Sequence, residues 1–585
     1  MRGTAGRKRL LHSFHIVTIG MLLAVIGLVG IIAPGRLQKR ISHMAAASPA
    51  TPRQWRMIEL QLHSARDVAE PLRDGVLVAV CTSPAGEEMR IAGFWNGDDS
   101  WKIRFTPTSP GRWNYRTICA DASNTGLHGQ TGILDVLPAA GKTSWEQHGG
   151  FLRVSSDRRS LTHTDGTPFF WLGDTWWFCP SDLMPIDHSN RPGIDSMFQK
   201  LIDTRATQGY SVIQMAFLGR LTPEGVFSGV SGQFQDLYES HLNPAYWQMV
   251  DRYLSYAIDA GILPVIGFGF HQGLNASTLE QDKTLWRYVM ARYSALPVTW
   301  LICGEYNQAG GKDGTLTDVD AARIAKILQL GQAIKDSDPY RRAMTVHPWW
   351  HKGEGQQAWS SPWHDFILLQ GGHIPEGPAP DFYRAIGRRT YPKPFLEGEC
   401  TYEGIRGFSD AVIRYNAYKA IQCGSFGYTY GAHGLWYPTQ DETDQKFKEW
   451  GAIVPWWKAM EFPGGAQMRH LGDFYRSLPW WTLMPVETDS VLEWTPHTTK
   501  GDDMALVTSS GPELYVAYFP AWESPEPRPA IRFIPALSGT AFTQEWFDPR
   551  TGVRTSGKTQ PDASGISLRI PTTADWLCVL RKQQG

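Results

Sequence analysis

Short apolar runs alternate with amphipathic stretches of helical period from about residue 150 to residue 460. The apolar runs are candidate strands at 169–172, 212–216, 263–268, 299–303, 343–346, 366–370, 394–396 and 424–429. The amphipathic stretches are candidate helices at 195–208, 246–260, 284–293, 319–335 and 410–422. Strands that alternate with helices favour a parallel sheet with crossover helices, and eight such units are typical of a (β/α)8 barrel. We therefore predict a barrel of the α/β class over residues 150–460.

Short alternating strands precede and follow this region in the sequence. Period-2 runs at 76–80, 90–95, 101–106, 112–118 and 132–136 predict a β-sandwich over residues 46–140. After a connector at 461–498, runs at 504–508, 514–519, 530–533, 543–547, 566–570 and 576–580 predict a second β-sandwich over 499–585. The predicted fold is a barrel flanked by two sandwiches.

The amino terminus carries an uncharged run at 16–33, preceded by three basic residues at 7–9. The run approaches the roughly 20 apolar residues that span a bilayer and exceeds a usual signal-peptide core. We expect residues 1–45 to form a short cytoplasmic stub and an uncleaved hydrophobic helix that anchors the chain in a membrane. A cleaved secretory signal is the alternative, with 45–47 as a place for cleavage. Either expectation puts the rest of the chain outside the cytoplasm.

Composition excludes some function classes and favours another. The net charge is -1, so the chain lacks the basic excess from which nucleic-acid binding draws most of its affinity. The seven cysteines are scattered and show no metal-ligand spacing, which argues against a structural zinc site and a dense disulfide scaffold. The chain has 25 Trp. The Trp side chain is a flat apolar ring with one polar N–H group, which suits both large cores and a sugar-binding cleft.

Two acidic tripeptides close predicted strands four and seven. They are Gly304-Glu305-Tyr306 and Gly398-Glu399-Cys400. Active sites of (β/α)8 barrels lie at the carboxyl ends of the strands, so both carboxylates are expected at one rim. Glycoside cleavage normally uses two such carboxyls, of which one protonates the leaving oxygen. We assign Glu305 as acid/base and Glu399 as nucleophile; Glu397 should point away by strand alternation, and Glu403 lies farther along the loop.

Further polar and aromatic residues follow most of the predicted strands. A single such residue is more often a cap or a satisfied structural group, but their recurrence at one rim favours a wet cleft. Rim histidines also raise metal-dependent hydrolysis as an alternative, although no ligand set with paired histidines on one strand is present. We expect no metal or other cofactor. The candidate substrate-binding residues are Asp174, Trp176, Gln214, His271, Tyr306, Asn307, His347, Trp349, Gln370, His373, Tyr402, His433 and Trp436.

Several motifs resemble the apiosidase-like glycoside hydrolase family. The most specific is the run from Pro168 to Trp177, PFFWLGDTWW; the supporting segments are 304–307, 345–348, 370–373 and 397–404. Segments 94–97 and 105–113 resemble an amino-terminal sandwich often fused to that family, and 546–552 resembles a carboxy-terminal sandwich once labelled collagen-binding. The resemblance implies a barrel with acid/base and nucleophile after strands four and seven, which map to Glu305 and Glu399.

These observations predict a glycoside hydrolase that acts on a polysaccharide or oligosaccharide, with two carboxylates and a retaining mechanism. The alternative is a non-catalytic carbohydrate-binding or adhesion protein at the cell surface. Expected partners are a carbohydrate substrate and, if the amino-terminal helix is uncleaved, a membrane, but no nucleic acid. The sequence leaves the sugar, the linkage and the oligomeric state open.

Overall fold

The computed structural model describes residues 51–72, 76–217, 220–221, 227–228, 244–311, 314–349, 355–388, 393–495, 504–524, 527–534, 541–558 and 565–583. The predicted hydrophobic helix at 16–33 lies outside these ranges. Over the described ranges, none of the helices combines the length and the apolar character that crossing a bilayer requires.

Eight parallel strands form a nearly closed barrel, which confirms the predicted fold class. Their hydrogen-bonded order is β16-β15-β14-β11-β10-β19-β18-β17. The strands are β10 (Trp171–Trp176), β11 (Val212–Phe217), β14 (Leu263–Phe268), β15 (Thr299–Leu301), β16 (Met344–Thr345), β17 (Ile367–Gln370), β18 (Phe395–Glu399) and β19 (Gly427–Tyr430). Almost every residue of these strands is buried, as expected when helices cover a parallel sheet.

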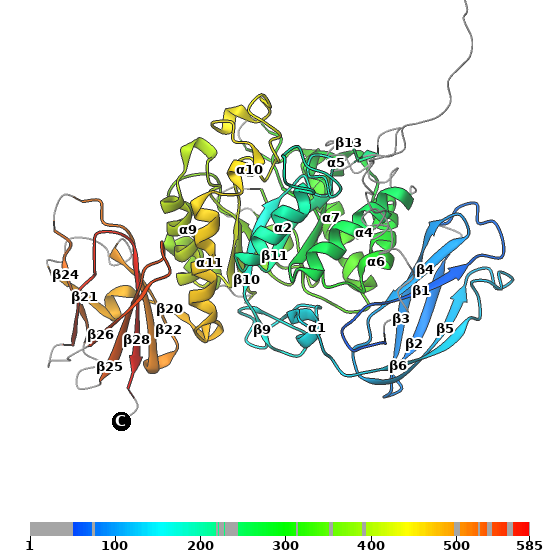
Figure 1. Ribbon diagram of the computed structural model, residues 1–585, viewed down its shortest axis with the longest axis horizontal. Coiled ribbons are helices and arrows are strands. Elements are labelled where there is room, and N and C mark those ends of the chain that lie inside the picture. The colour runs from blue at the N-terminus through cyan, green and yellow to red at the C-terminus, as the bar shows by residue number, and fades with distance from the viewer. Residues whose placement is uncertain are drawn as a thin grey trace, which may run out of the picture. The chain divides into compact units, whose positions relative to one another are not determined.

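Helices follow most of the barrel strands and surround them (Figure 1). They are α2 (Met197–Thr207), α4 (Pro244–Asp259), α5 (His271–Ala276), α6 (Leu279–Tyr293), α7 (Asp318–Ser337), α8 (Pro380–Gly387) and α9 (Asp410–Gln422). Thr278 and Thr317 form capping boxes at the starts of α6 and α7, where each side chain accepts a hydrogen bond from the third backbone N–H of its helix. α10 (Trp456–Ala459) and α11 (Pro463–Arg476) come after the last barrel strand.

The first and last strands of this order, β16 and β17, are joined by a few contacts instead of a regular ladder. The backbone N–H of Asp365 donates to the carbonyl of Met344 at 3.0 Å, and the hydroxyl of Thr345 donates to the carbonyl of Phe366 at 2.7 Å. The N–H of Met344 in turn donates to the Asp365 carboxylate at 2.9 Å. These bonds close the barrel although β16 has only two residues.

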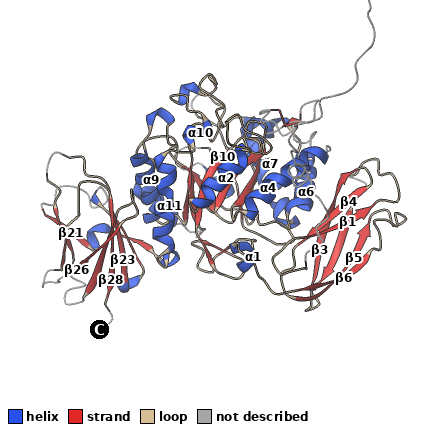
Figure 2. Cartoon of the chain, in the orientation of Figure 1, coloured by secondary structure: helices blue, strands red, loops and turns tan. Residues whose placement is uncertain are grey.

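The amino-terminal domain consists of strands only, apart from the short helix α1 (Ser144–His148) that leads into the barrel (Figure 2). Its strands are β1 (Ile58–His63), β2 (Leu77–Thr82), β3 (Glu88–Gly97), β4 (Ser100–Phe105), β5 (Gly111–Cys119) and β6 (Thr131–Val136). The first half of β3 pairs with β2 and the second half with β4, so one strand serves both parts of the sheet. Trp101 and Trp113 are fully buried in its core, and the nearby Cys81 and Cys119 are free thiols.

The carboxy-terminal domain contains a six-stranded antiparallel sheet, β20-β22-β23-β28-β25-β26, and a three-stranded sheet, β21-β24-β27. The strands are β20 (Met484–Val486), β21 (Leu492–Thr495), β22 (Leu506–Ser509), β23 (Leu514–Phe519), β24 (Ala530–Phe533), β25 (Phe542–Phe547), β26 (Arg554–Lys558), β27 (Ile566–Leu568) and β28 (Trp576–Lys582). One hydrophobic cluster draws on both sheets, as in a sandwich. β20 and β21 belong to these sheets although the sequence analysis placed 484–495 in the connector.

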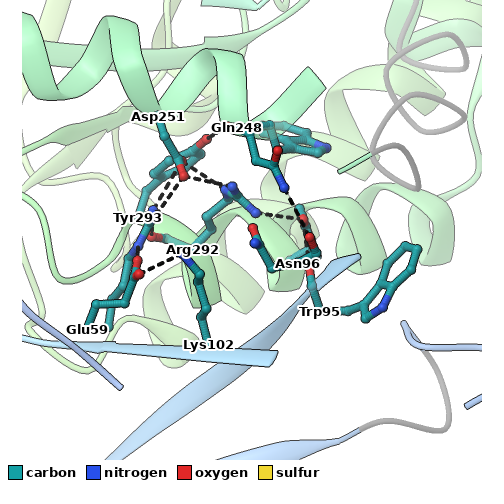
Figure 3. A network of polar contacts seen from close by, with 11 residues as sticks. Glu59, Trp95, Asn96, Lys102, Gln248, Asp251, Arg292 and Tyr293 are labelled. Carbon is teal, nitrogen blue, oxygen red and sulfur yellow. Dashed lines mark hydrogen bonds and ion pairs between the residues drawn. The ribbon is translucent and has the colours of Figure 1, made fainter. Parts of the chain in front are cut away.

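A buried ionic network joins the amino-terminal sandwich to the barrel helices (Figure 3). Asp251 on α4 accepts two hydrogen bonds from Arg104 on β4, at 3.1 and 2.6 Å, and two from Arg292 on α6, at 2.9 and 2.7 Å. Arg104 also bonds Glu59 on β1 at 2.9 Å. Each guanidinium is therefore paired with a carboxylate where it is buried away from water. A buried charge needs such a partner.

Candidate active site

Glu305 and Glu399 meet at the carboxyl-terminal rim of the barrel. Glu305 follows β15 and Glu399 ends β18. The side-chain amide of Gln370, at the end of β17, donates to Glu305 Oε1 at 3.2 Å and to Glu399 Oε1 at 3.1 Å. Two oxygens so close to one nitrogen are separated by at most the sum of these distances, 6.3 Å. The structure therefore brings the two predicted carboxylates into one site.

Two backbone irregularities place these side chains. Glu305 has a φ of 48°, a left-handed conformation that non-glycine residues adopt only at a cost in energy. The ladder between β17 and β18 shifts register between Leu369 and Gln370, so that Gln370 lies opposite Glu399. Neither irregularity shows in the hydrophobic pattern of the sequence.

Two histidines contact the Glu399 carboxylate. His347, which follows β16, places Nε2 3.0 Å from Glu399 Oε2, and His373 places Nε2 3.4 Å from Oε1. Burial alone would raise the pKa of Glu399, but the hydrogen bonds from both histidines outweigh it and hold that pKa well below its usual range. A pKa lowered in this way keeps Glu399 ionised near neutral pH.

Glu305 has the opposite electrostatic environment. Burial, reinforced by the negative charge of Glu399, raises the pKa of Glu305 above its usual value. The Nδ1 atom of His271 lies 3.7 Å from Oε2 of Glu305. Burial lowers the pKa of His271 to about 4, and the charge of Arg323 acts in the same direction. His271 is thus neutral near pH 7 and does not offset the shift of Glu305.

The two alternative glutamates have other partners. Glu397 accepts hydrogen bonds from the Gly371 N–H at 3.0 Å and from the Tyr383 hydroxyl at 2.6 Å. Glu403 accepts from the N–H groups of Gly464 and Gly465 at the start of α11, and from the Tyr430 hydroxyl at 2.7 Å. Glu397 stands two residues before Glu399, so strand alternation alone would place both side chains on one face, and the reason for setting Glu397 apart was wrong. The β17–β18 ladder shifts register at this point, and Glu397 and Glu403 each have partners other than Glu399.

Aromatic rings line the site beside Glu399. The ring of His373 lies 4.6 Å from that of Tyr402 and packs edge-on against Trp450 at 5.4 Å. Trp177 packs edge-on against His347 at 5.1 Å. The sequence analysis did not select Trp177 or Trp450. Trp177 closes the most specific motif and could have been chosen, whereas Trp450 ends a short 3-10 helix, η4 (Lys448–Trp450), that no sequence motif marks.

Other candidate residues make contacts beside Glu399 or elsewhere after the barrel strands. Gln214 donates across the barrel to the carbonyl of Gly398 at 3.3 Å, next to Glu399. The carbonyl oxygen of the Asn307 side chain accepts from the Trp349 N–H at 2.8 Å. Tyr306 is buried and its hydroxyl donates to Gln357 at 3.2 Å. His433 is buried after β19, and the Trp436 ring lies 4.6 Å from the Phe447 ring in a tilted arrangement.

Asp174 and Trp176 are not brought into contact with the two catalytic candidates. Both are fully buried within β10, which extends to Trp176, farther than the sequence pattern indicated. Asp174 accepts hydrogen bonds from Arg205 on α2 at 2.6 Å and from the Trp176 indole at 3.0 Å. This ion pair holds α2 against the first barrel strand. No local pattern in the sequence identified Arg205 as the partner.

In the part of the chain that the structure describes, no cluster of three or more His, Cys, Asp or Glu side chains is arranged to hold a metal ion. Three of the rim histidines, His271, His347 and His373, instead contact Glu305 or Glu399.

A model of the apiosidase-like catalytic domain matches residues 155–482, more than half of the chain. The chain belongs to the apiosidase-like family. A domain of unknown function, DUF5060, matches residues 51–120 in the amino-terminal part. No curated protein matches this apiosidase-like chain.

Solved structures agree with this fold. A structure described as a glycoside hydrolase is 22% identical, with a TM-score of 0.59, over 76% of this chain and 98% of its own. A glycoside hydrolase family 5 protein from Bacteroides vulgatus ATCC 8482 is 22% identical, with a TM-score of 0.59, over 75% and 94%. A second protein from that bacterium has a TM-score of 0.64 at 17% identity, over 91% and 99%. Family and fold together identify this apiosidase-like protein as a glycoside hydrolase.

Proposed function

We propose that this glycoside hydrolase cleaves a polysaccharide or oligosaccharide with retention of anomeric configuration, with Glu399 as nucleophile and Glu305 as acid/base. The observation that carries the proposal is the Gln370 amide shared by both carboxylates, which limits their Oε1 separation to 6.3 Å. Retaining enzymes hold the two carboxyl groups about 5–5.5 Å apart, whereas inverting enzymes need about 6.5–9.5 Å to admit a water.

The electrostatics of the site support these roles. Protonated Glu305 gives its proton to the glycosidic oxygen while Glu399 attacks the anomeric carbon. The bond between carbon and the leaving oxygen breaks, and a glycosyl ester with Glu399 forms. Glu305, now ionised, takes a proton from water, which attacks the same carbon and releases the Glu399 carboxylate. A raised pKa suits the first role of Glu305, and a low pKa suits a carboxylate that must attack and leave.

The remaining polar atoms support a substrate rich in hydroxyl groups. Within the described residues, Gln370 Oε1 and His373 Nδ1 are buried and have no hydrogen-bond partner. Buried polar atoms are normally paired, so atoms left over at an active site are available to a ligand. Sugar hydroxyls both donate and accept, and aromatic rings such as Trp450 can pack against the C–H face of a sugar.

The proposed roles are tested with Glu305→Gln and Glu399→Gln on a panel of phenyl and 2,4-dinitrophenyl glycosides of pentoses and hexoses. Glu399→Gln should lose at least about 10³-fold in kcat/KM on both leaving groups. Glu305→Gln should lose about 10²–10⁴-fold in kcat/KM on phenyl glycosides and far less on dinitrophenyl glycosides, because the dinitrophenolate leaving group departs without a proton. Glu493→Gln, an exposed glutamate on β21, is the matched control and should match the wild type.

Proton NMR of the first product formed decides between retention and inversion. Initial release of the anomer opposite to that of the substrate would contradict the proposed mechanism. If the wild type binds glycans but cleaves none of the panel or of natural polysaccharides, the carbohydrate-binding alternative stands instead.

We also propose that the enzyme acts outside the cytoplasm, with residues 1–45 as membrane anchor or secretory signal. The support is the uncharged run at 16–33 after a basic segment. Fractionation of cells that express the full chain tests this, and recovery of the enzyme in the cytosolic fraction would contradict it.

A further inference from the structure

The loop after β15 carries Glu305 in its left-handed conformation, and backbone hydrogen bonds hold the residues on each side of it. The Gly304 N–H donates to the carbonyl of Gly269 at 3.0 Å, and the Tyr306 N–H donates to the carbonyl of His347 at 3.1 Å. A residue with a Cβ keeps a left-handed φ only where the surrounding structure enforces it. The contacts that hold the rest of this loop therefore bear on where the Glu305 carboxyl points.

A buried arginine on α7 holds the part of the loop that follows Glu305. Arg323 is 3% exposed, and its Nε donates to the carbonyl of Tyr306 at 2.8 Å. Its Nη2 donates to the carbonyl of Gln308, and its Nη1 donates to the side chain of Asn275 on α5 at 3.2 Å. One planar guanidinium, with its donors in a fixed arrangement, thus holds two peptide groups of the loop just after Glu305.

A carboxylate of the same helix holds this arginine in place. Asp320 Oδ1 lies 2.9 Å from Arg323 Nη1, and both side chains are buried. The other oxygen, Asp320 Oδ2, accepts from the N–H of Gly310 at 2.9 Å and from the N–H of Thr317 at 2.8 Å. Asp320 therefore compensates the buried charge and also binds the loop to the start of α7.

We infer that Arg323 is a positioning residue for proton transfer by Glu305. By holding the carbonyls that follow, it keeps the Glu305 backbone left-handed and the Glu305 carboxylate beside the Gln370 amide. A displacement of about 1 Å in a catalytic group can cost about 10²-fold in rate, so a loop held in this way matters for the chemistry. This inference rests on the proposed function, because it names a residue that positions the proposed acid/base.

Arg323→Lys tests the inference on the phenyl and 2,4-dinitrophenyl glycosides. Lysine keeps the positive charge beside Asp320 but lacks the planar group that reaches both carbonyls. The value of kcat/KM should fall about 10–100-fold on phenyl glycosides and less than about 3-fold on dinitrophenyl glycosides, because only the phenyl leaving group needs the proton of Glu305. Equal losses on the two leaving groups would show that Arg323 only stabilises the fold, and would overturn the inference.

Arg342→Lys is the matched control for stability. Arg342 is a fully buried arginine that pairs with Asp338 at 2.7 Å and donates to the carbonyls of Leu296 and Val298, before β15, at 3.0 and 3.1 Å. It holds backbone carbonyls in the same manner, but at the other end of the strand from the active site. Both lysine variants should lower the melting temperature by about 3–10 °C. Only Arg323→Lys should affect the two leaving groups differently, and an equal difference with Arg342→Lys would contradict the inference.

A second variant and a crystal structure extend the test beyond Arg323→Lys and beyond hydrolysis. Asp320→Asn keeps the arginine but removes its carboxylate partner, so it should slow phenyl glycosides more than dinitrophenyl glycosides. In crystals of either variant, Glu305 should lose its left-handed φ or its contact with Gln370, and an unchanged Glu305 in both would overturn the inference.

Glu305→Gln separates failure of this inference from failure of the proposed function. If Glu305→Gln slows both leaving groups equally, the proposed role of Glu305 is wrong, and the role of Arg323 falls with it. If Glu305→Gln distinguishes the leaving groups whereas Arg323→Lys and Asp320→Asn do not, only the inference about Arg323 is wrong.

Discussion

Replacing Asp251 with Asn is expected to weaken the packing of the amino-terminal sandwich against the barrel. Its carboxylate accepts four hydrogen bonds, two from Arg104 and two from Arg292, whose side chains are 7% and 0% exposed. Asn keeps one acceptor oxygen and turns a donor toward the guanidinium groups. Arg104 retains Glu59, whereas the partner that Arg292 retains among the described residues is the neutral Tyr288 hydroxyl.

Two estimates of the loss agree. Removing one partner of a buried ion pair costs about 3–5 kcal/mol, and the remaining Glu59 favours the lower end. The arginines lower the pKa of Asp251 from 3.8 to about 2, against the effect of burial, and this shift corresponds to about 2–3 kcal/mol of stability at neutral pH. Because the pKa is lowered on folding, that stability is present above pH 3.8 and is lost as the pH falls through about 2.

Calorimetry and amide hydrogen exchange at β4 would measure the effect. Asp251→Asn should lower the melting temperature of the sandwich by about 5–10 °C at pH 7, and the difference from the wild type should shrink between pH 4 and pH 2. Asp187→Asn is the matched control: Asp187 also pairs with an arginine, Arg252, but both are about half exposed, so its loss should cost less than about 1 kcal/mol. Equal melting temperatures and exchange rates for the two variants would refute the reasoning.

Three further outcomes are expected. The value of kcat/KM should fall at alkaline pH as Glu305 loses its proton. This alkaline fall should be absent for Glu305→Gln on a dinitrophenyl glycoside, and its persistence would exclude Glu305 as the acid. Gln370→Ala should lower kcat about 10–100-fold and shift its alkaline fall to higher pH, because the amide hydrogen bond lowers the pKa of Glu305. An alkaline fall at the same pH as in the wild type would argue against the shared contact. Glu403→Gln should cost about 1–3 kcal/mol in unfolding experiments through the lost bonds to α11 while kcat stays within about 3-fold, and a larger fall in kcat would place Glu403 in the catalytic site.

The barrel, and the meeting of Glu305 and Glu399 at one rim, could be predicted from the sequence because local patterns encode them. Each buried strand is a run of apolar residues, and Glu305 and Glu399 both stand where such a run ends. Parallel strands of a barrel present their carboxyl ends at one rim, so residues far apart in the chain meet there without further information.

Long-range side-chain pairing could not be predicted. The partner of Asp174 is Arg205 on a neighbouring helix, and nothing in the local pattern distinguishes it from other helical arginines. Likewise, β20 is a short, partly exposed strand whose pairing with β22 decides that it belongs to the last domain. Trp450 enters the site only because its loop folds back beside His373.

The sparse junction between β16 and β17 has a consequence for how the enzyme fails. His347 follows β16 on one side of this junction, and Gln370 ends β17 on the other, yet both contact Glu399. If the few bonds of Met344, Thr345 and Asp365 loosen on heating, the two side chains that contact Glu399 separate while the rest of the barrel stays folded. Thermal inactivation should therefore begin at this junction, at temperatures below those at which the secondary structure melts.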